Sequence, residues 1–219
     1  MIPLKRHKRA LFNPQPQKRA TGQIFIRGKR IGLFGGSFNP AHEGHLHISS
    51  EALKKLNVDE IWWLISPQNP LKTVEGMASF ETRMETARNL CKHPALKVSD
   101  YEKHAKTYYT VDTIKNLLKQ YPHNRFVWIM GADNLKYFIR WYQWKEIFKL
   151  LPIAIFDRQP YAGSACSTIP LQRFKRWRVP ERASTKLVFY RSPAWVFLHC
   201  RLHNASASAI RKKYNHNLF

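Results

Sequence analysis

The chain has 219 residues, of which 44% are hydrophobic, and its formal net charge is +23. This length suits one α/β domain with a full core. No apolar run approaches the roughly 20 residues of a membrane-spanning helix, so we expect no membrane partner. Three widely spaced cysteines, Cys91, Cys166 and Cys200, argue against a disulfide framework. They favour reduced thiols in a cytoplasm.

The first thirty residues carry nine Lys and Arg residues and no Asp or Glu, which leaves +14 on the remainder. Such charge attracts polyanions but does not distinguish nucleotides from RNA, DNA or an anionic membrane surface. The same stretch contains Pro3, Pro14 and Pro16 and shows no helical or strand period. We therefore expect residues 1–25 to be a disordered basic tail and residues 26–219 to form the domain. A mitochondrial targeting helix is opposed by the prolines.

Strand and helix patterns alternate from Arg30 onward. We expect strands at 30–34, 60–66, 97–99, 125–130 and 153–156, and helices at 44–56, 80–92 and 109–120. This alternation predicts one α/β domain with a Rossmann-like parallel sheet and helices on both faces. Ligands of such sheets bind beyond the carboxyl ends of the strands, where Gly35, Gly131 and Asp157 would lie.

Residues 32–49 read GLFGGSFNPAHEGHLHIS and are the most informative part of the chain. A predicted strand runs into a Gly-Gly-Ser turn and then into a helix that begins with His42 and His45. Glycines at such a turn let backbone N–H groups approach a phosphate, and the helix N-terminus adds partial positive charge. The two histidines share one face of the first turn. A zinc site is disfavoured, because the metalloprotease signature needs its second histidine where this chain has Leu46.

This segment resembles the GGSF(D/N)PxHxGH motif of the HxGH nucleotidylyltransferases. Within that superfamily, the chain resembles the bacterial nicotinate-nucleotide adenylyltransferases, although Asn39 stands where many relatives carry Asp. The resemblance implies that His42 and His45 are catalytic and hydrogen-bond the α-phosphate of ATP. It also implies substrate binding by the residues of the turn, which are Gly35, Gly36, Ser37 and Phe38.

Two other predicted strands are followed by candidate binding residues. Lys72 follows the second strand in a proline-rich loop, and the family has a similar loop at the substrate entrance. A solvated surface lysine is the alternative. Asp133 follows the strand at 125–130, where a carboxylate commonly binds a ribose hydroxyl or Mg²⁺. The resemblance places it near the adenosine, and the alternative is an N-cap for a helix starting near Leu135.

Three residues are implicated by resemblance in binding the nicotinate ring. Trp141 lies in a segment like the family's F-x-x-W-x-x-W/Y, whose first Trp stacks on the ring. A pyridinium against an indole face combines stacking with a cation–π contact. For Trp144 we expect core packing. Thr110 lies in a copy of SYTxxTL, and Arg158 matches a family arginine, with an ordinary surface arginine as the alternative.

Residues 206–211, SASAIR, resemble the family's ISSTxIR motif. A Ser hydroxyl and free N–H groups at a helix N-terminus, followed one turn later by Arg, can hold a triphosphate. The resemblance assigns these roles to Ser208, as a substrate-binding residue, and to Arg211, as a catalytic residue beside His42 and His45. Ala207 and Ser208 replace the commoner Ser and Thr, and a simple N-cap at Ser206 or Ser208 is the local alternative.

The resemblance implies transfer of AMP from ATP to nicotinate mononucleotide, which yields nicotinate adenine dinucleotide and pyrophosphate, with Mg²⁺ as cofactor. The sequence shows no nucleophile–base pair. The mononucleotide's own phosphate would therefore attack the α-phosphorus of ATP, while the protein positions the reactants and stabilises charge.

Three alternatives remain open. A sister adenylyltransferase would act on nicotinamide mononucleotide or phosphopantetheine. A class I aminoacyl-tRNA synthetase shares the HxGH-type signature, but this chain lacks a KMSKS loop and an anticodon domain. An RNA-binding protein is favoured by the basic tail, whereas the intact His42, His45 and Arg211 count against a nucleic-acid partner. The sequence predicts no particular oligomeric state.

Overall fold

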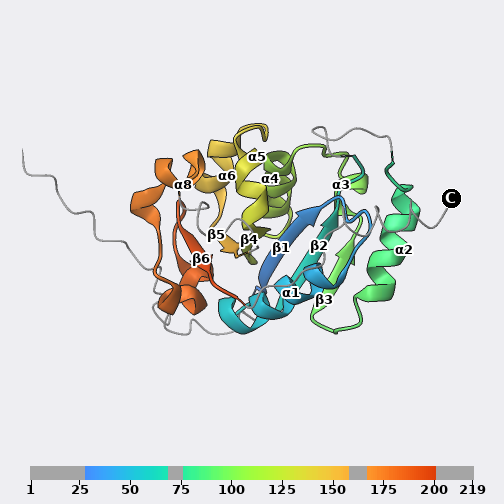
Figure 1. Cartoon of the computed structure of the whole chain (residues 1–219), viewed down its shortest axis with the longest axis horizontal. Helices are drawn as coiled ribbons and strands as arrows, with labels where there is room; N and C mark the ends of the chain where they lie inside the picture. Colours follow the sequence, from blue (N-terminus) through green and yellow to red (C-terminus); the bar gives the residue numbers. More distant parts are fainter. Residues whose placement is uncertain (1–27, 69–75, 158–166, 201–219) are drawn as a thin grey trace, which may run out of the picture.

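The computed structural model describes residues 28–68, 76–157 and 167–200 (Figure 1). Six parallel strands form one sheet in the order β3-β2-β1-β4-β5-β6. The strands are β1 (Arg30–Gly36), β2 (Glu60–Ile65), β3 (Leu96–Ser99), β4 (Arg125–Gly131), β5 (Ile153–Phe156) and β6 (Trp195–Leu198). The predicted Rossmann-like parallel sheet is therefore confirmed. The predicted basic tail lies outside the described residues.

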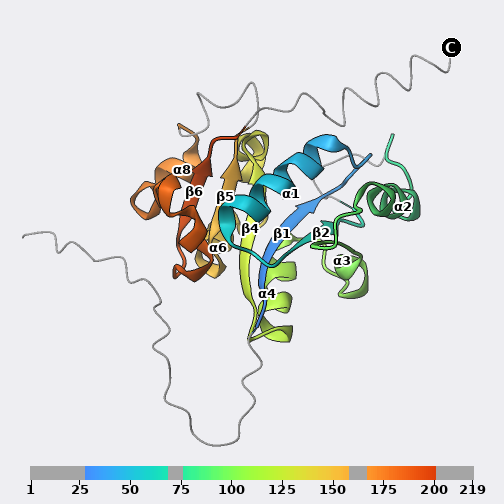
Figure 2. The same ribbon diagram turned by 90° about the horizontal axis from the view of Figure 1, so that it is seen from below.

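Helices cover both faces of the sheet, as predicted. The α-helices are α1 (Glu43–Leu56), α2 (Phe80–Leu90), α3 (Tyr101–His104), α4 (Thr110–Gln120), α5 (Leu135–Phe138), α6 (Trp144–Leu150) and α8 (Ile169–Arg173). The 3-10 helices are η1 (Ala132–Asn134), η2 (Lys175–Trp177) and η3 (Glu181–Phe189). One buried cluster joins α1, α2 and η3 to the sheet, and another joins α4, α5, α6 and α8 to it. Figure 2 shows α1 and α4 on opposite sides. Within the described ranges, no helix has the length and hydrophobicity to cross a bilayer.

The end of β1 differs from the sequence prediction. Gly35 and Gly36 do not form the predicted turn but continue the strand, where they pair with Leu64 and Ile65 of β2. A side chain at Gly35 has no room, because its Cβ would lie 2.5 Å from Cη2 of Trp128 on β4. The first glycine therefore makes room for an indole that packs against the sheet.

Beyond Phe34 the two central strands part. The pairing of β1 with β4 runs from Arg30–Arg125 to Phe34–Ile129, although β1 continues to Gly36 and β4 to Gly131. Here the strand order also reverses, because β2 lies on one side of β1 and β4 on the other. In doubly wound sheets ligands bind at this switch point, beyond the carboxyl ends of the strands.

We predict that Gly35→Ala lowers the free energy of unfolding by about 1–3 kcal/mol, because the added methyl group overpacks a closed region. Urea denaturation followed by circular dichroism measures the loss. A smaller ring at position 128 should relieve the clash, so Gly35→Ala should cost less in a Trp128→Phe background than in the wild type. Equal costs in the two backgrounds would contradict the packing role of Gly35.

Candidate functional site

The histidine pair opens α1 beside the carboxyl end of β1. His42 is the N-cap residue, and its Nδ1 accepts a hydrogen bond from the Gly44 N–H at 3.1 Å. His45, one turn later, accepts from the His42 N–H through its own Nδ1 at 3.2 Å. The two ring centroids lie 3.9 Å apart. The shared face predicted from the spacing is thus confirmed, and the rings also form a reciprocal cap for the helix.

This capping arrangement fixes the tautomer of both rings. A neutral imidazole has one protonated and one unprotonated nitrogen, and in each ring Nδ1 accepts from a backbone N–H. The proton of each neutral ring is therefore on Nε2, which becomes the hydrogen-bond donor. Two Nε2–H groups, set on a helix N-terminus, are suited to hold an anionic oxygen.

The aromatic residues around His45 hold its ring in place. Phe38 lies 4.6 Å from the His45 ring and stacks on Trp63 at 5.0 Å, with Phe34 completing the cluster. Phe38 is only 3% exposed and has a positive φ of 46°. Its side chain therefore belongs to the packing beneath the site. The predicted contact with substrate remains a prediction for its backbone.

The carboxyl end of β4 supplies the next candidate. Asp133 lies in η1, directly after the strand, and is half-buried. The alternative role as N-cap of the following helix is wrong, since α5 begins at Leu135 and its N-cap residue is Asn134. The predicted contact of Asp133 with a ribose or Mg²⁺ stays a prediction.

The structure brings the segments of Thr110 and Trp141 together. The ring of Tyr109, before Thr110, lies 4.6 Å from that of Tyr142, after Trp141. Trp141 is half-buried and meets Trp128 edge to face at 6.2 Å. Because Trp128 also covers Gly35, one indole lies between the predicted phosphate-binding segment and the predicted nicotinate-binding segment. Trp144 packs against the core cluster, as expected.

Two buried ionisable residues beside the end of β2 were missed from the sequence. Arg83 of α2 donates to the backbone oxygens of Ser37 and Ser66 at 2.7 Å each. Glu102 of α3 is 6% exposed and accepts from Thr113 Oγ1 at 3.2 Å and from the Ser66 side chain. Burial raises the pKa of Glu102 to about 7, while the two hydrogen bonds oppose that shift. The only sequence signal for Arg83 is a charged residue on the stripe of α2 that also holds Phe80 and Ala87.

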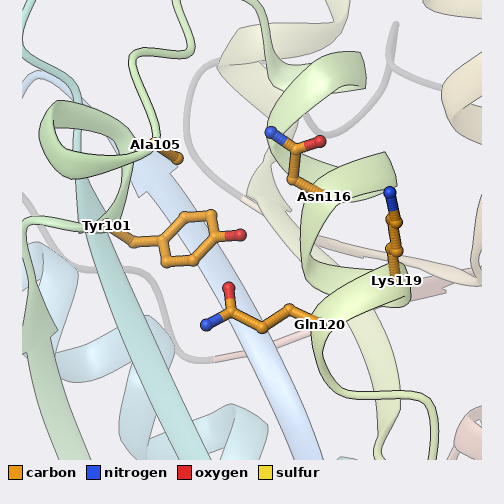
Figure 3. Close-up of a pocket in the computed structure, with 5 residues that line it drawn as sticks. All are labelled: Tyr101, Ala105, Asn116, Lys119 and Gln120. Carbon is orange, nitrogen blue, oxygen red and sulfur yellow. The ribbon is translucent and has the colours of Figure 1, made fainter.

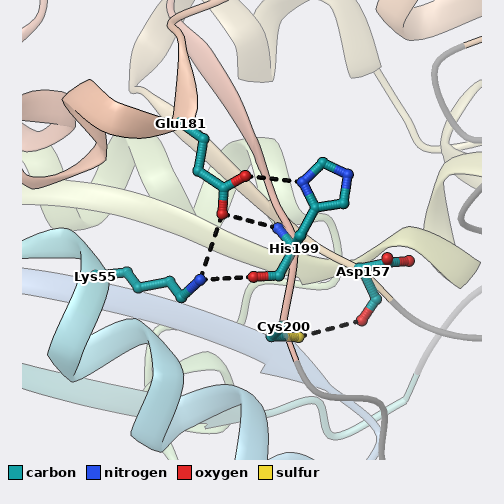
Figure 4. A network of polar contacts seen from close by, with 5 residues as sticks. All are labelled: Lys55, Asp157, Glu181, His199 and Cys200. Atoms are coloured by element: carbon teal, nitrogen blue, oxygen red, sulfur yellow. Dashed lines mark hydrogen bonds and ion pairs between the residues drawn. The ribbon is translucent and has the colours of Figure 1, made fainter.

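Four predicted site residues, Lys72, Arg158, Ser208 and Arg211, lie outside the described residues. A polar network holds His199 and Cys200, which come directly before residues 201–219 (Figure 4). Lys55 of α1 donates to the His199 carbonyl at 2.6 Å and to Glu181 of η3 at 3.3 Å. Glu181 also accepts from the His199 backbone N–H at 3.0 Å and contacts its ring at 2.8 Å. Burial would raise the pKa of Glu181, but these hydrogen bonds outweigh it and lower the pKa.

A hollow lies between α3 and α4 (Figure 3). It has a volume of about 380 Å³, and it is lined by Tyr101, Ala105, Asn116, Lys119 and Gln120. No predicted site residue is among them. The switch point, with its histidine pair, therefore remains the candidate site.

Comparison with known proteins identifies the family of this chain. Residues 33–213 match the cytidylyltransferase-like family. The chain belongs to this family. A protein of Methylorubrum extorquens named "Probable nicotinate-nucleotide adenylyltransferase" is 44% identical over 184 residues, covering 84% of this chain and all of that protein. Proteins of the same name from Agrobacterium fabrum and Roseobacter denitrificans are 41% and 44% identical, covering 84% and 85% of this chain and 98% and 93% of their own lengths.

A solved structure supports the fold of this family member. The Plasmodium falciparum nicotinic acid mononucleotide adenylyltransferase, in complex with NaAD, aligns with a TM-score of 0.62 at 19% identity. The alignment covers 84% of this chain and 83% of that one. The similarity shows the fold that the two proteins share.

We predict that Glu102→Gln removes a pH dependence of stability. The folded-state pKa of about 7 lies above the ordinary 4.5, so the contribution of Glu102 is complete below pH 4.5 and is lost as pH rises through 7. The free energy of unfolding of the wild type should fall by about 3 kcal/mol over this range. Glutamine stays neutral at every pH. The stability of the variant relative to that of the wild type should therefore increase as the pH is raised from about 5 to about 8.

Urea denaturation at both pH values measures this difference. Glu85→Gln, which alters an exposed carboxyl on α2, is the control and should follow the wild type. A constant difference between Glu102→Gln and the wild type would show that the buried carboxyl is ionised throughout this range.

Proposed function

We propose that this protein transfers AMP from ATP to nicotinate mononucleotide, releasing pyrophosphate and forming nicotinate adenine dinucleotide. The observation that carries the proposal is the contact of the His42 and His45 rings at the switch point, where Nδ1 of each ring accepts a hydrogen bond from a backbone N–H at the start of α1. The names of the relatives from Methylorubrum extorquens and Agrobacterium fabrum support this substrate.

The reaction needs positioning more than it needs a protein nucleophile. A phosphate oxygen of the mononucleotide attacks the α-phosphorus of ATP, a new P–O bond forms, and the bond to the β-phosphate breaks with pyrophosphate as the leaving group. His42 and His45 donate to the α-phosphate oxygens, on which charge changes during transfer. The partial positive charge of the α1 N-terminus acts in the same direction.

The remaining assignments place each substrate group near a predicted residue. We assign backbone donors to Gly35 and Gly36 at the end of β1 and to Ser37 and Phe38 after it, and we assign a substrate contact to Lys72. Asp133 binds the adenosine ribose, and Trp141, Thr110 and Arg158 receive the nicotinate. Ser208 and Arg211 hold the β- and γ-phosphates of ATP.

Magnesium ion fits this donor set as a companion of ATP. In proteins Mg²⁺ is commonly held by one or two carboxylates together with substrate phosphates. Among the described residues no group of three His, Cys, Asp or Glu side chains could form a metal cage, whereas Asp133 lies at the strand end. The bound ion would neutralise charge on the β- and γ-phosphates.

We predict that His42→Ala and His45→Ala each lower kcat by about 10²–10³-fold, because each removes one donor to the transferring phosphate. Pyrophosphate release is measured with ATP, Mg²⁺ and, in parallel, nicotinate mononucleotide, nicotinamide mononucleotide and phosphopantetheine. His47→Ala, on the same helix, is the control and should keep wild-type turnover. Turnover with another acceptor would change the substrate, and no turnover with any of the three would refute the activity.

We also predict that excess EDTA abolishes pyrophosphate release and that added Mg²⁺ restores it, because the ion screens the leaving phosphates. The far-ultraviolet circular dichroism spectrum should stay unchanged, since the metal enters with ATP. Full activity in EDTA would contradict the requirement for Mg²⁺.

A further inference from the structure

The guanidinium of Arg83 joins three segments of backbone. Arg83 is 1% exposed. Its Nη1 donates to the carbonyl oxygens of Ser37 and Ser66, at 2.7 Å each, and its Nη2 donates to that of Pro67 at 2.8 Å. Its Nε donates to the carbonyl oxygen of Ala78 at 3.2 Å. The turn after β1, the segment after β2 and the approach to α2 therefore meet at one side chain.

Stability alone does not explain a charge in this position. Within the described part of the chain Arg83 forms no salt bridge, and burial lowers the pKa of its guanidinium. Well-packed apolar residues are often at least as stabilising as a buried charged group. What the planar guanidinium supplies is several donors at fixed angles, which apolar residues lack and which lysine offers only as a point charge.

Asn39 also binds the segment before α2, but from the turn that follows β1. Its Nδ2 donates to the Gly76 carbonyl oxygen, and its Oδ1 accepts from the Ala78 N–H, both at 3.1 Å. Ala78 is thus held by Asn39 through its N–H and by Arg83 through its carbonyl oxygen. Asn39 belongs to the turn that leads into His42, so this contact ties the histidine segment to the chain before α2.

We propose that Arg83 and Asn39 are positioning residues of the adenylyl-transfer site. By holding the β1–α1 turn against the segments that follow β2 and precede α2, they set where the phosphate donors of the turn stand relative to the substrates. This inference rests on the proposed function. A displacement of about 1 Å in such an alignment can cost about 10²-fold in rate.

The first experiment compares Arg83→Ala and Arg83→Lys with Arg88→Ala. Arg88 is an exposed arginine on the same helix, so its removal controls for the loss of one positive charge. We expect kcat/KM for nicotinate mononucleotide to fall about 10²-fold in both Arg83 variants and to stay at the wild-type value in Arg88→Ala. Millimolar guanidinium chloride should restore kcat of Arg83→Ala in a saturable way, whereas urea, a neutral molecule of similar shape, should not.

The second experiment uses Asn39, whose replacement leaves Arg83 in place. Asn39→Ala removes both contacts, whereas Asn39→Asp keeps an acceptor for the Ala78 N–H. We expect a large loss of kcat/KM in Asn39→Ala and a smaller one in Asn39→Asp. If Arg83→Ala does not fold, Arg83→Lys and the Asn39 pair decide the question. Wild-type kinetic constants in Arg83→Lys and Asn39→Ala, even with lowered melting temperatures, would overturn the proposal.

A binding measurement separates this inference from the proposed function. Calorimetry with α,β-methylene-ATP reports on the phosphate site without turnover. If the wild type releases no pyrophosphate with any acceptor, the proposed function fails. The positioning role is then upheld by weaker binding of the analogue in Asn39→Ala and Arg83→Lys but not in Arg88→Ala. Equal binding in all these variants would overturn it.

Discussion

The candidate site depends on β1 lying in the middle of a parallel sheet between β2 and β4. All carboxyl ends of a parallel sheet point the same way, and the reversal of strand order here sends the following segments to opposite sides. The pairing of β1 with β4 ends at Phe34 and Ile129 while both strands continue. The segment that leads to α1 and the start of η1 thus follow the carboxyl ends of neighbouring strands. Residues nearly 90 positions apart in the sequence, such as His45 and Asp133, are brought to the same edge.

The histidine pair shows how one local interaction serves both folding and chemistry. The first N–H groups of an α-helix lack partners within the helix. Two of the N–H groups at this end of α1 are satisfied by imidazole nitrogens rather than by the usual hydroxyl or carboxylate. An imidazole differs from those groups because its second nitrogen must then carry the proton. The capping contact therefore provides two donors at the positive end of the helix dipole, where a phosphate is most favoured.

The sequence was sufficient to predict those parts of the fold that leave a periodic pattern or a motif. The strands at 30–34, 60–66, 125–130 and 153–156 and the three longer helices were placed within a few residues. Between Phe156 and the motif at 206–211 no element was predicted, although β6 completes the sheet. Its four residues, Trp195–Leu198, are all buried, and such a short apolar run has no period that separates strand from helix. The turn at 35–37 was placed too early, because the partner that requires glycine is an indole on another strand.

The contacts of Arg83 and Asn39 share a physical feature that hides them from sequence reasoning. Arg83 and Asn39 make their contacts with backbone carbonyl and N–H groups, which every residue carries. A hydrogen bond between two side chains requires a suitable residue type at both positions. A hydrogen bond from a side chain to the backbone requires one at the side chain's position only. In a single sequence Arg83 is therefore visible only as an exception to the apolar stripe of α2. A charge within an apolar helix face is costly to bury, so it marks a place where the geometry of neighbouring backbone has to be held. At this site the backbone so held leads directly into the histidine pair.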